Sequence, residues 1–239
     1  MGKRLRLPKR VDWTTVVFLF VLVSLVAAVS YSIACIATSP SGAVPDAPYG
    51  KTKSDYTLML VQCLLGIAVI FLPSVLEKQL KLSIPKSILI AYSLFLYCSI
   101  ILGEVQSFYY RVPFWDTVLH AFSGAMLGLV GVIVIASLNE QDKIRVNLNS
   151  AFVSVFAFCF ALTVGALWEV YEFTFDGLLG LNMQKHLLES GEPLTGREAL
   201  GDTMKDLIVD AMSAFAVIFG YHFRNRAKAI PSLAGEPAA

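Results

Sequence analysis

The chain has 239 residues, of which 56% are apolar and 15% are charged, whereas about 25% of the residues in a typical soluble domain are charged. Its mean hydropathy is +0.66 and its formal net charge is +1. This composition excludes a disordered chain, a collagen, a coiled coil and an ordinary soluble enzyme, and the small net charge argues against a nucleic-acid partner. It predicts a polytopic membrane protein surrounded by membrane lipids, and it identifies no protein partner.

Six stretches of the chain are long and apolar enough, or nearly so, to cross a membrane as helices. About 20 mostly apolar residues are needed for about 30 Å of hydrocarbon. The stretches lie at about residues 13–37, 56–76, 87–104, 115–138, 150–174 and 205–223. We therefore predict an all-α fold with a six-helix transmembrane domain over residues 13–223. A basic segment at 1–12 precedes this domain and a disordered tail at 224–239 follows it.

The basic residues predict how these spans are oriented. Of the lysines and arginines, 13 lie in the N-terminal segment, the tail and the segments after the second and fourth spans, against 6 on the other side. Because basic residues are retained on the cytoplasmic side, we predict that both termini are cytoplasmic. The apolar run at 16–37 exceeds the roughly 7–15 residues of a signal peptide, so we expect an uncleaved first span.

Ionisable residues gather at the predicted outer ends of the last three spans. In chain order they are Asp116, His120, Glu169, Glu172, Asp176, Asp202, Lys205, Asp206 and Asp210. Spacings of three or four residues place the acidic members of each span on one helix face. Glycines at 124, 128 and 131 continue the face of His120, and small residues mark close helix packing in membranes. We therefore expect His120 to face the interior of the bundle.

The ionisable groups of the last three spans are also expected at similar depths in the membrane. At about 1.5 Å per residue, these groups fall within about 10 Å of the outer surface, which predicts one outward-facing pocket. Its expected core is His120, Glu169, Glu172, Asp206 and Asp210, with Asp116, Asp202 and Lys205 in support. So many carboxylates need a cation, shared protons or basic partners. We expect Asp202 to be a helix N-cap and Asp176 to be the most exposed member.

The residue types allow three kinds of function. Carboxylates with one imidazole can hold Mg²⁺, Mn²⁺, Ca²⁺ or Zn²⁺, and Glu169 or Glu172 would then be the candidate general base for hydrolysis at the membrane interface. The same groups would suit a proton- or cation-coupled transporter, or a structural or accessory membrane protein whose polar network fixes helix packing. The sequence leaves open whether the protein is an enzyme.

Three segments carry a family resemblance. Residues 114–124 read FWDTVLHAFSG, residues 168–173 read WEVYEF and residues 202–206 read DTMKD. Over roughly residues 84–223 the chain resembles the YjdF family of bacterial inner-membrane proteins, and more loosely VanZ-like membrane proteins. It departs from the latter where they tend to have Glu-Gln and this chain has Glu169 and Glu172. The resemblance implies a bacterial inner or plasma membrane and no particular reaction.

Overall fold

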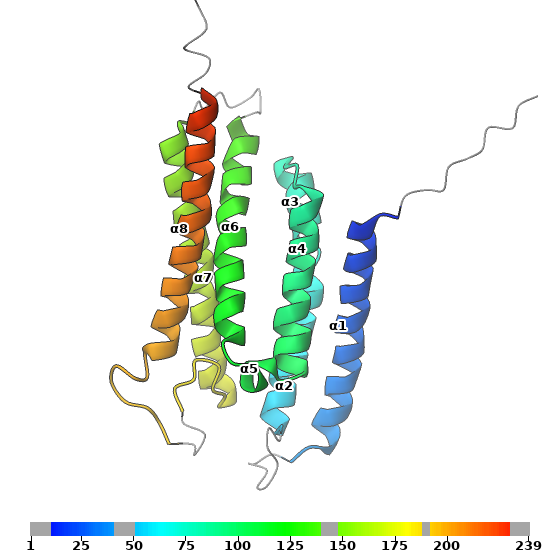
Figure 1. The fold of residues 1–239 in the computed structure, drawn as a ribbon. Helices are drawn as coiled ribbons and strands as arrows, with labels where there is room; N and C mark the ends of the chain where they lie inside the picture. The colour runs from blue at the N-terminus through cyan, green and yellow to red at the C-terminus, as the bar shows by residue number, and fades with distance from the viewer. Residues whose placement is uncertain (1–10, 41–50, 140–147, 188–191, 230–239) are drawn as a thin grey trace, which may run out of the picture.

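The computed structural model describes residues 11–40, 51–139, 148–187 and 192–229. These residues form a bundle of helices (Figure 1). The helices are α1 (Trp13–Thr38), α2 (Lys53–Val69), α3 (Leu72–Leu80), α4 (Lys86–Leu96), the π-helix η1 (Tyr97–Val105), α5 (Phe108–Arg111), α6 (Trp115–Asn139), α7 (Ser150–Leu179) and α8 (Gly201–Ala229). Within the described ranges, six helical stretches are long and apolar enough to cross a membrane, which confirms the predicted six-span, all-α class.

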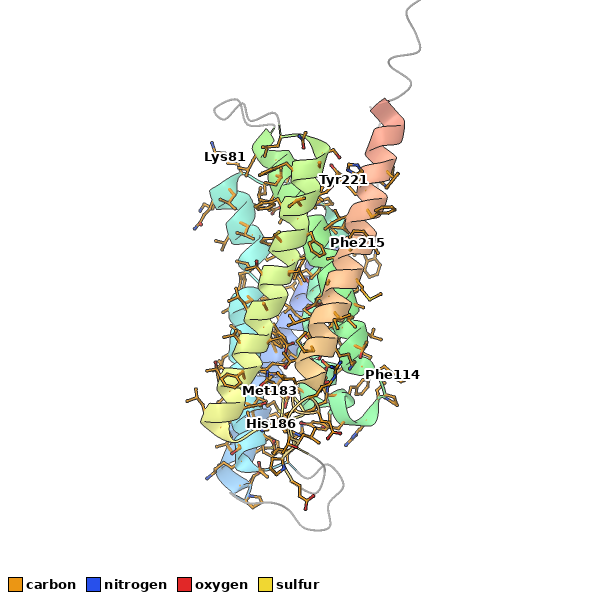
Figure 2. The ribbon with its side chains drawn as sticks, turned by 90° about the vertical axis from the view of Figure 1, so that its left-hand side faces the viewer. Lys81, Phe114, Met183, His186, Phe215 and Tyr221 are labelled. Atoms are coloured by element: carbon orange, nitrogen blue, oxygen red, sulfur yellow. The ribbon has the colours of Figure 1, made fainter. Side chains whose placement is uncertain are left out.

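The first described helix begins, and the last one ends, at the same end of the bundle. The N-terminal end of α1 and the C-terminal end of α8 both point toward the top of Figure 1, on opposite sides of the bundle, and α5 lies toward the bottom. In Figure 2, Lys81 and Tyr221 lie at the first end, whereas Phe114, Met183 and His186 lie at the other. We call the end that carries α5 the outer end. Its outward orientation remains a prediction, because residues 1–10 and 140–147, which hold many of the basic residues, lie outside the described ranges.

Several helices extend beyond their predicted limits. Helix α7 continues to Leu179 and ends at Gly180, whose φ of 66° supplies the left-handed conformation of a helix C-cap. Helix α8 begins at Gly201 and continues to Ala229, so the prediction of disorder from residue 224 is wrong for 224–229. That segment reads RNRAKA and is rich in good helix formers. Residues 230–239 of the predicted tail, like residues 1–10 of the basic segment, lie outside the described ranges.

The bundle consists of two halves with separate apolar cores. In the first half, α1, α2 and α4–η1 pack around Val21, Leu25 and Met59. In the second half, α6, α7 and α8 pack around Val132, Ala157, Ala161, Ala214 and Ile218. Contacts between the halves are sparser than those within them. A cavity lined by residues of both halves lies between them.

Glycines allow the helices of the second half to approach closely. A Cβ atom on Gly124 would lie 2.6 Å from the backbone oxygen of Asp210 in α8, and one on Gly131 would lie 2.8 Å from Cα of Ala157 in α7. Small residues serve this purpose in membranes, where backbone packing replaces the hydrophobic effect. The glycine face of α6 thus lies against both of its neighbours, and it turns His120 inward.

A proline break shapes the inner part of the first half. Pro73 lies at the start of α3 and has no N–H for the carbonyl of Val69, which ends α2. The hydroxyl of Tyr92 in α4 donates to that carbonyl instead, at 2.6 Å. A side chain from the neighbouring helix therefore satisfies the freed carbonyl, as backbone groups require in lipid.

Candidate functional site

The buried residues of α7 form a stripe along one face of the helix, and so do those of α8. The acidic residues of the second half belong to these two stripes. The buried positions of α7 are Val153, Ala157, Ala161, Gly165, Glu169, Glu172 and Asp176. On α8, Asp206 and Asp210 are 1% and 2% exposed and share a face with Ala214. The same helical repeat therefore runs from apolar residues at the inner end to carboxylates at the outer end.

His120 and Asp210 join α6 to α8. Nδ1 of His120 lies 3.3 Å from Oδ2 of Asp210, and the hydroxyl of Ser123 donates to Oδ1 of Asp210 at 3.2 Å. Gly165 of α7 leaves room for this carboxylate, because a Cβ atom there would lie 2.5 Å from Oδ2 of Asp210. Asp210 is thus enclosed by three helices and bonded to two side chains of α6.

Asp116 and Asp206 face the same imidazole. Nε2 of His120 lies 3.7 Å from Oδ1 of Asp116. One ligand atom each from Asp116, His120 and Asp206 lie within 4.8 Å of one another. Oδ1 of Asp206 is buried with no hydrogen-bond partner among the described residues. We call Asp116, His120 and Asp206 the triad.

Lys185 covers the outer side of the triad. Its Nζ donates to Oδ2 of Asp116 and, at 3.0 Å, to Oδ2 of Asp202. Burial disfavours the ammonium charge, but the attraction of Asp116 and Asp202 and the hydrogen bonds to them outweigh it and raise the pKa of Lys185 above its ordinary value. Lys205, which is about half exposed, lies 3.7 Å from Oδ1 of Asp202 and 3.8 Å from Oδ1 of Asp206.

Two expectations about this region are wrong. Asp202 is not an N-cap, because α8 already begins at Gly201 and the carboxylate pairs with Lys185. Asp176 is not the most exposed acid but is 7% exposed. It accepts the backbone N–H groups of Met183 and Gln184 at 2.8 and 3.0 Å. The loop after α7 folds back over the helix end and buries Asp176.

The two glutamates of α7 have different surroundings. Both carboxylate oxygens of Glu169 are buried and have no hydrogen-bond partner among the described residues. Glu169 is one turn outward from Gly165, which contacts Asp210. Glu172 accepts the indole N–H of Trp168 at 2.9 Å. It lines a separate polar pocket and is not a member of the triad.

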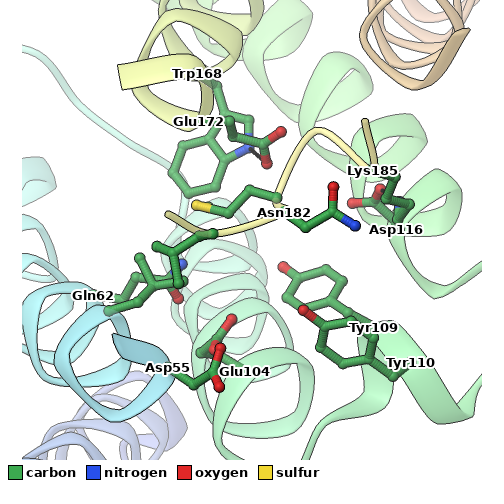
Figure 3. A pocket seen from close by; sticks show the side chains of 13 residues that line it. Asp55, Gln62, Glu104, Tyr109, Tyr110, Asp116, Trp168, Glu172, Asn182 and Lys185 are labelled. Carbon is green, nitrogen blue, oxygen red and sulfur yellow. Dashed lines mark hydrogen bonds and ion pairs between the residues drawn. The ribbon is translucent and has the colours of Figure 1, made fainter. Parts of the chain in front are cut away.

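The polar pocket lies between the two halves at the outer end (Figure 3). Among the described residues, its acidic lining residues are Asp55, Glu104, Asp116 and Glu172, and its basic lining residue is Lys185. Tyr109, Tyr110 and Trp168 add aromatic rings. Burial, together with the nearby carboxylates, raises the pKa of Tyr109 well above its ordinary value, so this phenol stays neutral.

Comparison with known proteins places the chain in a family. Residues 46–226 match a family model described as "Predicted membrane protein (DUF2238)". The chain belongs to the DUF2238 family. It is also 29% identical over 150 residues to an "Uncharacterized protein" of Thermotoga maritima, which covers 62% of this chain and 68% of the relative. No solved structure matches it significantly. The family match and the six helices make this DUF2238 member a multi-pass membrane protein.

Sequence reasoning missed several residues of this DUF2238 protein. Lys185 lies in a loop with no periodic pattern. A search for a basic residue to balance the acidic outer ends of the helices would have identified it. Asp55 and Glu104 come from the first half of the chain, where only the position of Glu104 within an apolar stretch gave a signal. The indole N–H of Trp168 donates a hydrogen bond to Glu172, which its apolar neighbours in the sequence did not indicate.

Proposed function

We propose that the outer end of α6–α8 binds a divalent cation through Asp116, His120 and Asp206. The observation that carries this proposal is the convergence of the three ligand atoms within 4.8 Å, with Oδ1 of Asp206 buried and without a hydrogen-bond partner in the described part of the chain. Such an oxygen is costly to bury without a hydrogen-bond partner, and Nζ of Lys205, 3.8 Å away, is beyond hydrogen-bond reach. A cation between the three groups would supply that partner.

The surroundings of His120 support the proposal. Asp210 lies beside Nδ1, and a carboxylate in that position fixes the tautomer in which Nε2 carries the lone pair. Nε2 then points toward Asp116, 3.7 Å away. A lone pair opposite a carboxylate is repulsive unless a proton or a metal ion lies between them. This is the arrangement in which a carboxylate orients a metal-binding histidine.

The ligand set favours particular cations. Two carboxylates and one imidazole suit Mn²⁺ or Zn²⁺, whereas Mg²⁺ and Ca²⁺ prefer oxygen ligands alone. Three protein ligands leave coordination positions open for water or a substrate oxygen. A bound cation of this kind acidifies its water and polarises a phosphoryl or carbonyl oxygen.

Hydrolysis at the membrane interface is the reaction we propose for this site. Glu169 is the better candidate for the general base, because its oxygens, apart from an interaction with the Thr203 hydroxyl, have no hydrogen-bond partner among the described residues. Glu172 is already bonded to Trp168. We also propose that the chain is a relative of the YjdF proteins it resembles, since the motifs of that resemblance contain all three triad residues.

Mn²⁺ binding to the purified protein in detergent tests the proposal. We expect one bound Mn²⁺ per chain by electron paramagnetic resonance, and a loss of at least about tenfold in affinity in D206N. E198Q is the control, because Glu198 is an exposed carboxylate just before α8 and lies outside the triad. Wild-type protein that binds no Mn²⁺, Zn²⁺, Mg²⁺ or Ca²⁺ would overturn the proposal and favour a structural network. A cation-coupled proton flux in liposomes would favour transport.

A further inference from the structure

An apolar cavity of about 280 Å³ lies between the two halves, on the inner side of the polar pocket. Its lining comes mainly from α2, α4, α6 and α7 and includes Leu65, Val69, Phe95, Leu119 and Val164. Its polar lining residues include Asp116, His120 and Asp210. The cavity therefore has an apolar body and reaches the proposed cation site.

The length of the cavity matches one leaflet of a bilayer. Along the α2–α3 segment its lining runs from Gln62 to Leu72, which is about 15 Å at about 1.5 Å per residue. The hydrocarbon core is about 30 Å thick, so the cavity is about half as long as that thickness, and it reaches Tyr92 and Leu72 in the inner part of the first half. Its volume is near the lower limit of about 300 Å³ for small-molecule sites. This space suits one acyl chain and not a whole lipid.

The apolar cavity and the polar pocket adjoin each other. Gln62, Tyr109, Asp116 and Trp168 line both of them. A single amphipathic molecule can therefore place its chain in one and its headgroup in the other.

The charges of the polar pocket select the headgroup. In the described part of the chain its lining has four carboxylates and one ammonium group, so it favours a positively charged group. The rings of Tyr109, Tyr110 and Trp168 surround the same space (Figure 3), and aromatic faces attract ammonium groups. Glu172 is 8% exposed and extends from α7 into this pocket. A headgroup with only negative charge would be repelled.

We propose that the site binds an aminophospholipid, with one acyl chain in the apolar cavity and its ammonium group in the polar pocket. Its phosphate oxygens would complete the coordination of the cation held by the triad, so this part of the proposal rests on the proposed function. Asp116 lines both cavities and belongs to the triad. The phosphate would thus lie at the cation, between the ammonium group in the polar pocket and the chain in the apolar cavity, which is the order in which a phospholipid links them.

Lipid binding to the full-length protein in detergent tests this inference. The probes are phosphatidylethanolamine and phosphatidylglycerol with identical chains, each titrated with Mn²⁺ present and with a chelator in its place. We expect phosphatidylethanolamine to bind at least about tenfold more tightly in wild-type protein, and E172Q to remove most of that preference. E172Q should still bind Mn²⁺, because Glu172 lies outside the triad.

A pair of phenylalanine variants tests the chain site. V164F puts a ring into the cavity and should weaken both lipids about equally, whereas V170F, on the exposed side of the same helix, should bind like wild type. Equal binding of the two lipids in wild type, or equal binding by V164F and V170F, overturns the inference even where Mn²⁺ binds. Binding that responds to V164F and E172Q but not to the chelator supports the lipid site and overturns only the contact of its phosphate with the cation.

Discussion

Gly165 is the position where a single added methyl group tests the packing of the site most directly. A Cβ atom at residue 165 would lie 2.5 Å from Oδ2 of Asp210 and 3.3 Å from its Cγ. In G165A this carboxylate must move. Oδ2 is the atom that lies 3.3 Å from Nδ1 of His120, and the partner oxygen accepts the hydroxyl of Ser123 at 3.2 Å. The movement therefore weakens the link between α6 and α8.

The expected loss corresponds to about one of these two hydrogen bonds. A hydrogen bond to a charged group contributes about 1.5–3 kcal/mol, and about 1 kcal/mol changes Tm by about 2–4 °C in a chain of this size. We expect G165A to lower Tm by about 3–12 °C relative to G177A. G177A is the matched control on α7, since nothing lies within 4 Å of a Cβ atom there. Both variants gain the same helix propensity, so their difference measures the steric effect.

The same glycine variants in a D210A background test whether the Asp210 carboxylate is the group that the added methyl group contacts. In D210A the carboxylate is gone, and Cβ of residue 210 lies 3.7 Å from the added Cβ atom, which is an ordinary contact. G165A should then cost no more than G177A. Thermal unfolding of each glycine variant, in the wild-type and D210A backgrounds and in one detergent, completes the cycle. An equal loss for G165A in both backgrounds would refute the placement of Asp210 against α7.

Three further predictions concern packing, electrostatics and topology. G124A should lower Tm more than G220A, because its Cβ atom would meet the backbone of α8 whereas Gly220 has open space; equal shifts would contradict the close contact of α6 with α8. K185M should lower Tm at neutral pH more than K53M does. That difference should shrink at alkaline pH, because the stability from a raised lysine pKa is full below the ordinary value of about 10.4 and is lost above the folded one. A reporter fused after Ala229 should be active only in its cytoplasmic form, and one inserted at Gly196 only in its external form.

Local pattern alone determined the six spans and the inward face of α6. Long apolar runs in lipid have to form helices, because every backbone polar group must be satisfied within the segment. A spacing of three or four residues then places Glu169 and Glu172, or Asp206 and Asp210, on one side of their helix. The glycine stripe that continues from His120 was sufficient to turn this side chain inward. These features depend on neighbours in the sequence, so they could be predicted.

Only the tertiary structure decided which groups meet. Asp206 faces His120 and Asp116, whereas Glu172 faces Trp168 and a pocket shared with Asp55 and Glu104. This division depends on how each helix is rotated about its axis and on how the two halves pack, and helical periodicity specifies neither. The ion pairs of Lys185 and the burial of Asp176 depend on a loop that folds back over the end of α7. Loop paths have no repeating pattern from which such contacts could be read, so the sequence determined the candidate groups and the packing determined the site.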